Sequence, residues 1–161
     1  MIDGFLFVLT LVTAIACGLV AGFFFAFSTT VMKALARLQG TQGMDAMRSI
    51  NVVVINPLVM TALFGTALAC VVLVVAAFVE WGEAYAVSLL VGGLLYLAGV
   101  VVVTIAYHVP RNDALAAADP AEAAAASQWA RFVRTWTAWN HLRTLAPLGT
   151  ASLFTIALRV S

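Results

Sequence analysis

Charged residues are scarce in this chain, at 9% of 161 residues, whereas hydrophobic residues make up 64%. About a quarter of the residues of a soluble globular domain are charged, and a disordered chain has far fewer apolar residues, so both classes are excluded. Eight lysines and arginines against seven acids leave a net charge of +1. This balance gives no electrostatic footprint for nucleic acid or for a strongly acidic partner. The composition is that of a membrane protein.

Cysteine is equally rare. The two cysteines, Cys17 and Cys70, both lie in apolar runs, where packing as small hydrophobic side chains is favoured over a disulfide, a nucleophile or a metal ligand. Short motifs for phosphate binding, zinc hydrolysis, a serine nucleophile and haem attachment are also absent from the sequence. The placement of polar groups within the apolar runs is then the remaining guide to function.

Four stretches are long and apolar enough to cross a bilayer, which takes roughly 20 residues in a helix. They run over residues 4–27, 51–79, 84–109 and 139–158. The first is not a secretory signal, because its lead of Met1, Ile2 and Asp3 is acidic rather than basic and its apolar run is too long. The sequence thus predicts one domain over residues 1–161, an all-α integral membrane four-helix bundle with both termini on the same side.

The basic residues predict the orientation of this bundle. Cytoplasmic loops carry the excess of lysine and arginine, and the outer side has Arg159 alone. We therefore expect an integral protein of the cytoplasmic (inner) membrane, with both termini outside and the two long loops in the cytoplasm. The seven basic residues on the loop side are Lys33, Arg37, Arg48, Arg111, Arg131, Arg134 and Arg143.

Both cytoplasmic connections are expected to hold interfacial helical segments. Residues 31–38 have one apolar and one basic face, which is typical of a helix at the membrane surface. Pro110 is expected to end the third span. Asp119, followed by a proline, is expected to cap a further helix that runs into the fourth span, where Pro147 permits a kink.

Small residues at helical spacing predict how the helices pack, because helices in lipid associate by close backbone approach. Gly18 and Gly22 form a GxxxG pair in the first span. We expect these faces to support association with further copies of the chain as a homo-oligomer. A small, weakly polar stripe also follows the first span, over Thr10, Thr13, Cys17, Ala21 and Ser28, and another follows the third, over Ser88, Gly92, Tyr96, Thr104 and His108.

Polar residues gather at one level, the cytoplasmic ends of the predicted spans. In an antiparallel bundle these helix ends are neighbours whichever way the bundle is inserted. Polar groups inside or at the edge of a membrane cost free energy, so their presence is informative about function. The residues of this polar layer are Asn51, Asn56, His108, Asn112, Asp113, Asn140, His141 and Arg143, with Trp136 and Trp139 beside them.

Each residue of the polar layer also has a structural interpretation. Arg143 fits a positive-inside anchor, and the tryptophans fit an aromatic belt at the headgroups. The asparagines fit helix caps or interhelical hydrogen bonds, and a lone histidine at a helix end is more often a structural residue than a ligand or a base. The conjunction of both histidines, the amides, an acid and an arginine in one layer favours a functional pocket there.

Two runs in this layer resemble the anthrone oxygenase-like family of small four-helix membrane proteins. They are HVPRNDAL at residues 108–115 and WNHLRT at residues 139–144, and the segment 51–57 with Trp129 and Trp136 also fits. The resemblance covers nearly the whole chain in layout. It implies oxidation of an anthrone to an anthraquinone with dioxygen as co-substrate and without an organic cofactor.

The residues of the polar layer have expected roles in that chemistry. His141 is the expected general base, because an unperturbed imidazole titrates at roughly pH 6.5. Arg143 and Asn140 are expected to stabilise the developing oxyanion, and Trp136 and Trp139 to stack on a flat tricyclic ring. The other expected substrate-binding residues are Asn51, Asn56, His108, Asn112 and Asp113.

Two other functions stay open. One is a non-catalytic membrane protein that binds a small molecule or assists assembly or transport. The other is a metal- or haem-binding redox protein that uses His108 and His141, which lie on different helices without a paired ligand motif. A channel is disfavoured, because no span carries repeated charges along its length. The expected partners are a hydrophobic small-molecule substrate and the lipid bilayer.

Overall fold

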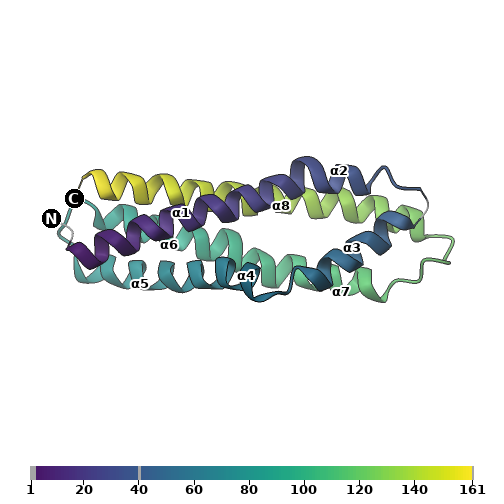
Figure 1. Cartoon of the computed structure of the whole chain (residues 1–161), viewed down its shortest axis with the longest axis horizontal. Helices are drawn as coiled ribbons and strands as arrows, with labels where there is room; N and C mark the ends of the chain where they lie inside the picture. The colour runs from purple at the N-terminus through teal and green to yellow at the C-terminus, as the bar shows by residue number, and fades with distance from the viewer. Residues whose placement is uncertain (1–2, 40, 161) are drawn as a thin grey trace.

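The computed structural model describes residues 3–39 and 41–160, and all regular structure among them is helical. The long helical rods lie side by side and alternate in direction, and both ends of the chain are at the same end of the bundle (Figure 1). The prediction of an all-α bundle with its termini together is confirmed. Met1 and Ile2, part of the lead that argued against a secretory signal, lie outside the described residues.

Three rods are built from consecutive helical segments, some of them π-helical. The first comprises α1 (Gly4–Ala26), η1 (Phe27–Val31) and α2 (Met32–Leu35). The second comprises α4 (Pro57–Met60), η2 (Thr61–Gly65) and α5 (Thr66–Val79). The third comprises α6 (Ala86–Tyr96), η3 (Leu97–Val102), η4 (Thr104–His108) and α7 (Val109–Ala117). The fourth rod is α8 (Ala125–Arg159), and the shorter α3 (Gln42–Val53) links the first rod to the second.

The first three rods are long and apolar enough to cross a membrane, and each contains a stretch of 18 residues whose mean hydropathy is 2.4, 2.7 and 2.5, respectively. Among the described residues, α8 is not apolar enough to meet the same criterion, so three helices rather than the predicted four have this composition. It nevertheless packs along both α1 and α6. The predicted fourth span, residues 139–158, therefore lies inside a membrane bundle as part of a longer and more polar helix.

The predicted second span begins too early. Asn51 belongs to α3, which ends at Val53, and the membrane helix starts only at Pro57. Asn56 produces this start, since its Oδ1 accepts a hydrogen bond from the N–H of Val59 at 3.1 Å and its Nδ2 donates to the Val53 carbonyl at 3.0 Å. An asparagine cap followed by proline favours a helix start, because the proline N–H would be unused there.

Three other boundary predictions are wrong. Residues 31–35 continue the first rod instead of forming a separate interfacial helix. The third rod passes through Pro110, because this proline lies in the first turn of α7, where its missing N–H costs little. Asp119 accepts a hydrogen bond from Ala121 at 2.9 Å, but this closes only a turn that precedes α8. Pro147 lies within an uninterrupted α8.

Close helix contacts use small residues, though not the predicted glycine pair. A Cβ added at Gly92 of α6 would lie 2.6 Å from the ring of Phe154 on α8, so only glycine fits this contact. A Cβ at Gly18 or Gly22 would meet nothing within 4 Å, so the GxxxG face makes no contact within the chain. The polar stripe of the first span is confirmed as inward-facing, since Thr10, Thr13, Cys17, Ala21 and Ser28 are all buried.

Candidate functional site

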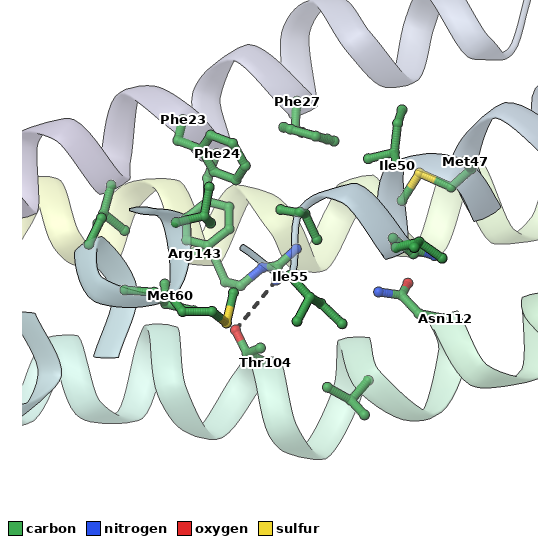
Figure 2. A pocket seen from close by; sticks show the side chains of 18 of the residues that line it. Phe23, Phe24, Phe27, Met47, Ile50, Ile55, Met60, Thr104, Asn112 and Arg143 are labelled. Atoms are coloured by element: carbon green, nitrogen blue, oxygen red, sulfur yellow. Dashed lines mark hydrogen bonds between the residues drawn. The ribbon is translucent and has the colours of Figure 1, made fainter. Parts of the chain in front are cut away.

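A cavity of about 910 Å³ lies inside the bundle (Figure 2). Its walls come from α1 and η1, from the segment α3–α4–η2, and from η4, α7 and α8. Phe23, Phe24 and Phe27 of the first rod contribute aromatic rings, and aliphatic and methionine side chains of α3, α4 and η2 line much of the rest. Pockets for drug-sized ligands occupy roughly 300–1,000 Å³, so a polycyclic organic molecule fits here.

Arg143 extends from α8 into this apolar cavity and is only 5% exposed. One terminal nitrogen donates to Oδ1 of Asn140 at 2.7 Å. The other donates to Oγ1 of Thr104 at 3.4 Å (Figure 2). The guanidinium carbon also lies 4.4 Å from the ring centroid of Phe24 and 5.1 Å from that of Trp136. No carboxylate of the described residues lies within 4.0 Å, and the Nε has no hydrogen-bond partner. The cavity thus contains a buried positive charge without a negative partner.

Asn140 holds this guanidinium in place. Residues three apart lie on the same face of a helix, so Asn140 and Arg143 both project from one side of α8. The Asn140 Nδ2 donates to the carbonyl of Phe24 and to Oγ of Ser28, both at 2.8 Å, while its Oδ1 accepts from Arg143. Asn140 is fully buried and does not line the cavity. It positions the guanidinium and has no surface for a substrate.

Trp136 joins α8 to α7 beside the charge. Its Nε1 donates to Oδ1 of Asn112 at 3.1 Å, and both residues line the cavity. His108 packs edge-on against the Trp136 ring, with ring centroids 4.9 Å apart. His108 is buried, neither of its ring nitrogens has a hydrogen-bond partner of good geometry, and it is not part of the cavity lining.

Asn51 and Asp113 complete the predicted residues that reach the cavity. The Nδ2 of Asn51 is buried and has no hydrogen-bond partner. Asp113, in contrast, is exposed. The large cavity therefore has an amide with unused bonding capacity in one wall and a carboxylate where it approaches solvent.

Besides Asn140 and His108, three predicted residues lie outside the large cavity. Asn56 caps α4 and lines a smaller neighbouring pocket. Trp139 stacks on Tyr107, with ring centroids 4.4 Å apart. His141 is exposed on α8. The residues of the polar layer that line the cavity are thus Arg143, Trp136, Asn51, Asn112 and Asp113. Asn140 and His108 contact residues of this wall, and Asn56, Trp139 and His141 lie elsewhere.

Sequence analysis missed the contribution of the first rod and of Thr104. Phe24 and Ser28 fix the Arg143–Asn140 pair from α1 and η1. A phenylalanine in an apolar span carries no signal of this role. Ser28 and Thr104 could have been found, because both belong to the weakly polar stripes. The members of these stripes were interpreted as packing residues.

Arg48 was also missed as part of the cavity wall. Its Nε donates to the carbonyl of Leu115 at 3.0 Å, and a terminal nitrogen donates to the carbonyl of Ala118. Its other terminal nitrogen pairs with Asp45 at 3.2 Å. Arg48 therefore ties α3 to the end of α7, and unlike Arg143 its guanidinium is fully engaged.

The two histidines differ in their surroundings, since His108 is buried and His141 is exposed. Within residues 3–39 and 41–160, no group of three or more histidine, cysteine, aspartate or glutamate side chains converges as a metal site would require. Among these residues neither histidine belongs to such a group.

These features define a small helical membrane protein whose apolar cavity contains an uncompensated buried cation. The anthrone oxygenase family matches residues 57–153, from the start of α4 through most of α8. The match covers more than half of the chain, so the chain belongs to this family, and the resemblance found in the sequence is confirmed. Trp136, Asn140 and Arg143 lie within the matched residues, whereas α1 and α3 lie outside them. Comparison with curated proteins and with solved structures gives no match.

Proposed function

We propose that this chain is a membrane-embedded oxygenase-type enzyme that oxidises a hydrophobic aromatic of the anthrone or quinol type with dioxygen. Membership of the anthrone oxygenase family supports the reaction class. The unpaired guanidinium of Arg143 among aromatic and aliphatic side chains supports the substrate class. This second observation carries the proposal, because a hydrophobic ligand that develops a negative charge supplies what the cavity lacks.

The reaction follows from the chemistry of an anthrone. Its methylene group is acidic because of the ring carbonyl, and loss of one proton gives an enolate whose electron-rich carbon reacts with dioxygen. The peroxide formed at that carbon breaks its O–O bond and its remaining C–H bond with loss of water, which leaves the second carbonyl. One anthrone and one dioxygen thus give one anthraquinone and one water, and the substrate supplies all the electrons.

Arg143 is the oxyanion donor in this scheme. Fixed donors in a site shielded from water stabilise developing charge, and loss of one such donor costs about 10²–10³ in kcat. Asn140 accepts a hydrogen bond from one terminal nitrogen at 2.7 Å, whereas the bond from the other to Thr104 is long, at 3.4 Å, so this second nitrogen can turn to a ligand oxygen. The rings of Trp136 and Phe24, which flank the guanidinium, offer flat faces on which an aromatic substrate can stack.

We assign the proton acceptor to Asp113, the carboxylate in the cavity lining. His141, the base expected from the sequence, is the alternative, although it is exposed and outside that lining. A general base contributes about 10²–10⁴ in rate. Asp113→Asn should therefore lower kcat at least about 100-fold and His141→Ala should leave it unchanged, and the opposite result would return the role to His141.

Dioxygen uptake tests the proposed function. Purified protein in lipid nanodiscs is given a simple anthrone without added metal, and uptake is compared with the autoxidation of the same anthrone in empty nanodiscs. We expect uptake well above this background, formation of the anthraquinone, and a fall toward background in Arg143→Gln. Equal rates with and without protein would overturn the assignment. A chelator in the same assay tests the prediction that no metal ion is needed, for which we expect an unchanged rate. The absorption spectrum of the purified protein tests the prediction that no haem is bound, for which we expect no Soret band.

A non-catalytic binding protein is the second candidate, because the same unpaired guanidinium would also bind a stable aromatic anion. Turnover distinguishes the two functions. A binder would take up such an anion in a manner that depends on Arg143 and would leave dioxygen uptake at the autoxidation rate.

Two further proposals concern the setting of this reaction. We place the chain in the cytoplasmic membrane with both termini outside, since seven of its eight basic residues lie on the side of the long loops; a reporter fused to the C-terminus tests this orientation. Self-association would use the open Gly18–Gly22 face of α1, where no atom of the chain opposes close approach of a second copy. Cross-linking of the wild type and of Gly22→Leu tests that contact.

A further inference from the structure

One opening of the cavity is lined by apolar side chains. Arg143, at its inner end, is 5% exposed, whereas four aliphatic residues that line the same cavity are between 66% and 81% exposed. We call this group the apolar mouth, and it consists of Leu19, Val52, Ile55 and Leu58. Leu19 comes from the first rod, Val52 and Leu58 flank the break between α3 and α4, and Ile55 lies within that break.

The apolar mouth has the composition of a lipid-facing surface. Leu19 and Leu58 lie in helices that are long and apolar enough to span a membrane. Side chains of this kind with such high exposure are suited to contact with hydrocarbon and poorly suited to contact with water. The break that Asn56 caps contributes Val52 and Ile55 to the same opening, because it prevents α3 from continuing along the second rod.

We infer that the ligand reaches the cavity sideways from the bilayer and is an amphiphile. Its planar ring system carries an ionisable oxygen that binds at Arg143, and a hydrocarbon chain extends from the ring through the apolar mouth. The anionic ring rests on the proposed function, while the chain and the lateral route go beyond it. The cavity volume is consistent with a ring system that carries a chain. It is about 910 Å³, which is near the upper end of the range for drug-sized ligands and exceeds what three fused rings need.

The effect of such a chain on affinity depends on the difference between its surroundings in the bilayer and in the apolar mouth. Lipid tails are as apolar as leucine side chains, so a chain gains little free energy when it moves from the bilayer into the mouth. We therefore expect tolerance of the chain, and not tighter binding, when the ligand concentration is expressed per lipid. A cavity closed to the bilayer would instead reject the chain.

Two probes that lack the acidic methylene group of an anthrone test this inference. Anthracene-2-carboxylate has three fused rings and an anionic oxygen, and its 6-decyl derivative adds the chain. Both are titrated by fluorescence into the full-length protein in nanodiscs. The variants are Leu58→Trp at the mouth, Leu68→Trp as a matched control and Arg143→Gln at the charge; Leu68 is 67% exposed but does not line the cavity.

We expect the wild type to bind the two probes with Kd values, per lipid, that agree within about threefold. Leu58→Trp should weaken binding of the decyl probe about tenfold or more while it changes the chainless probe less than about threefold, and Leu68→Trp should change neither. Rejection of the decyl probe by the wild type, or no selective effect of Leu58→Trp, would overturn the inference and leave the proposed function intact. Binding of both probes that is insensitive to Arg143→Gln would instead remove the anion site on which both proposals rest.

Discussion

The substitution Arg143→Gln removes the positive charge of the cavity but keeps an N–H donor that can bond to Asn140. An arginine within a membrane helix costs up to about 2.5–3.5 kcal/mol, the value for the bilayer centre, and this cost disappears in the variant. The contacts with the rings of Phe24 and Trp136 also disappear, and each is worth about 0.5–2 kcal/mol. These contributions nearly cancel, so we expect the free energy of unfolding to change by less than about 2 kcal/mol.

Turnover should respond very differently. Loss of one oxyanion donor predicts a fall in kcat of about 10²–10³. Arg48→Gln is the matched control, because Arg48 lines the same cavity but is already bonded to Asp45 and to the ends of α7. This second variant should lose about 1–3 kcal/mol of stability as α3 loosens from α7. Its kcat per folded molecule should stay within about threefold of wild type, since the charge at Arg143 is untouched.

Both quantities are measured on the same nanodisc samples. Thermal unfolding followed by circular dichroism gives the stability, and dioxygen uptake with an anthrone gives kcat after correction for the folded fraction. The reasoning fails if Arg143→Gln keeps its turnover, because the guanidinium would then not stabilise the reacting oxygen. It also fails if this variant is less stable than Arg48→Gln, because Arg143 would then be a structural residue whose loss affects activity only through folding.

Three further substitutions test individual contacts. Asn140→Ala should raise the Kd of anthracene-2-carboxylate about tenfold, because Arg143 loses its fixed partner, whereas Ser28→Ala removes one bond to Asn140 and should raise it less than about threefold. Gly92→Leu should prevent close packing of α6 on α8 and lower the Tm in detergent, while Gly18→Leu, with open space at its Cβ, should leave the Tm of the detergent-solubilised monomer unchanged. Asn56→Ala should destabilise the start of α4 by about 0.5–2 kcal/mol without a change in the Kd, which thermal melts and the same titration would detect; a changed Kd would show that the cap also shapes the site.

The helices could be predicted from the runs of apolar residues, but the rotation of their far ends could not. Tyr96 and His108 are both buried, although twelve residues of regular α-helix would turn them about 120° apart. The π-helical segments η3 and η4 between them change this rotation. No residue type in the sequence marks a π-helical turn, so only the structure shows which side of α7 is turned toward the bundle.

The polar residues of the site could be predicted from the sequence, but the direction in which each side chain points could not. Asn140 and Arg143 were found because an amide and a charge in a membrane helix demand partners. His141 lies between them in the sequence, but adjacent residues of a helix point about 100° apart, and His141 is exposed. Polarity alone does not decide which of two neighbouring polar residues faces inward, and it gives no sign of Phe24 or of the rest of the apolar wall.

The polar character of α8 has a consequence for how this protein is made. Of the four rods α8 alone lacks the composition of a membrane-crossing helix among the described residues, and the partners that Asn140 and Arg143 find outside α8 lie on the first and third rods. An isolated α8 would have to expose these groups to lipid, so it should enter the bilayer only after those rods are there to receive it. Glycosylation mapping of α8 alone, compared with α8 in the full chain, would detect this dependence, and efficient insertion of the isolated helix would contradict it. The charge that we propose to bind substrate thus also sets the order of assembly during biogenesis.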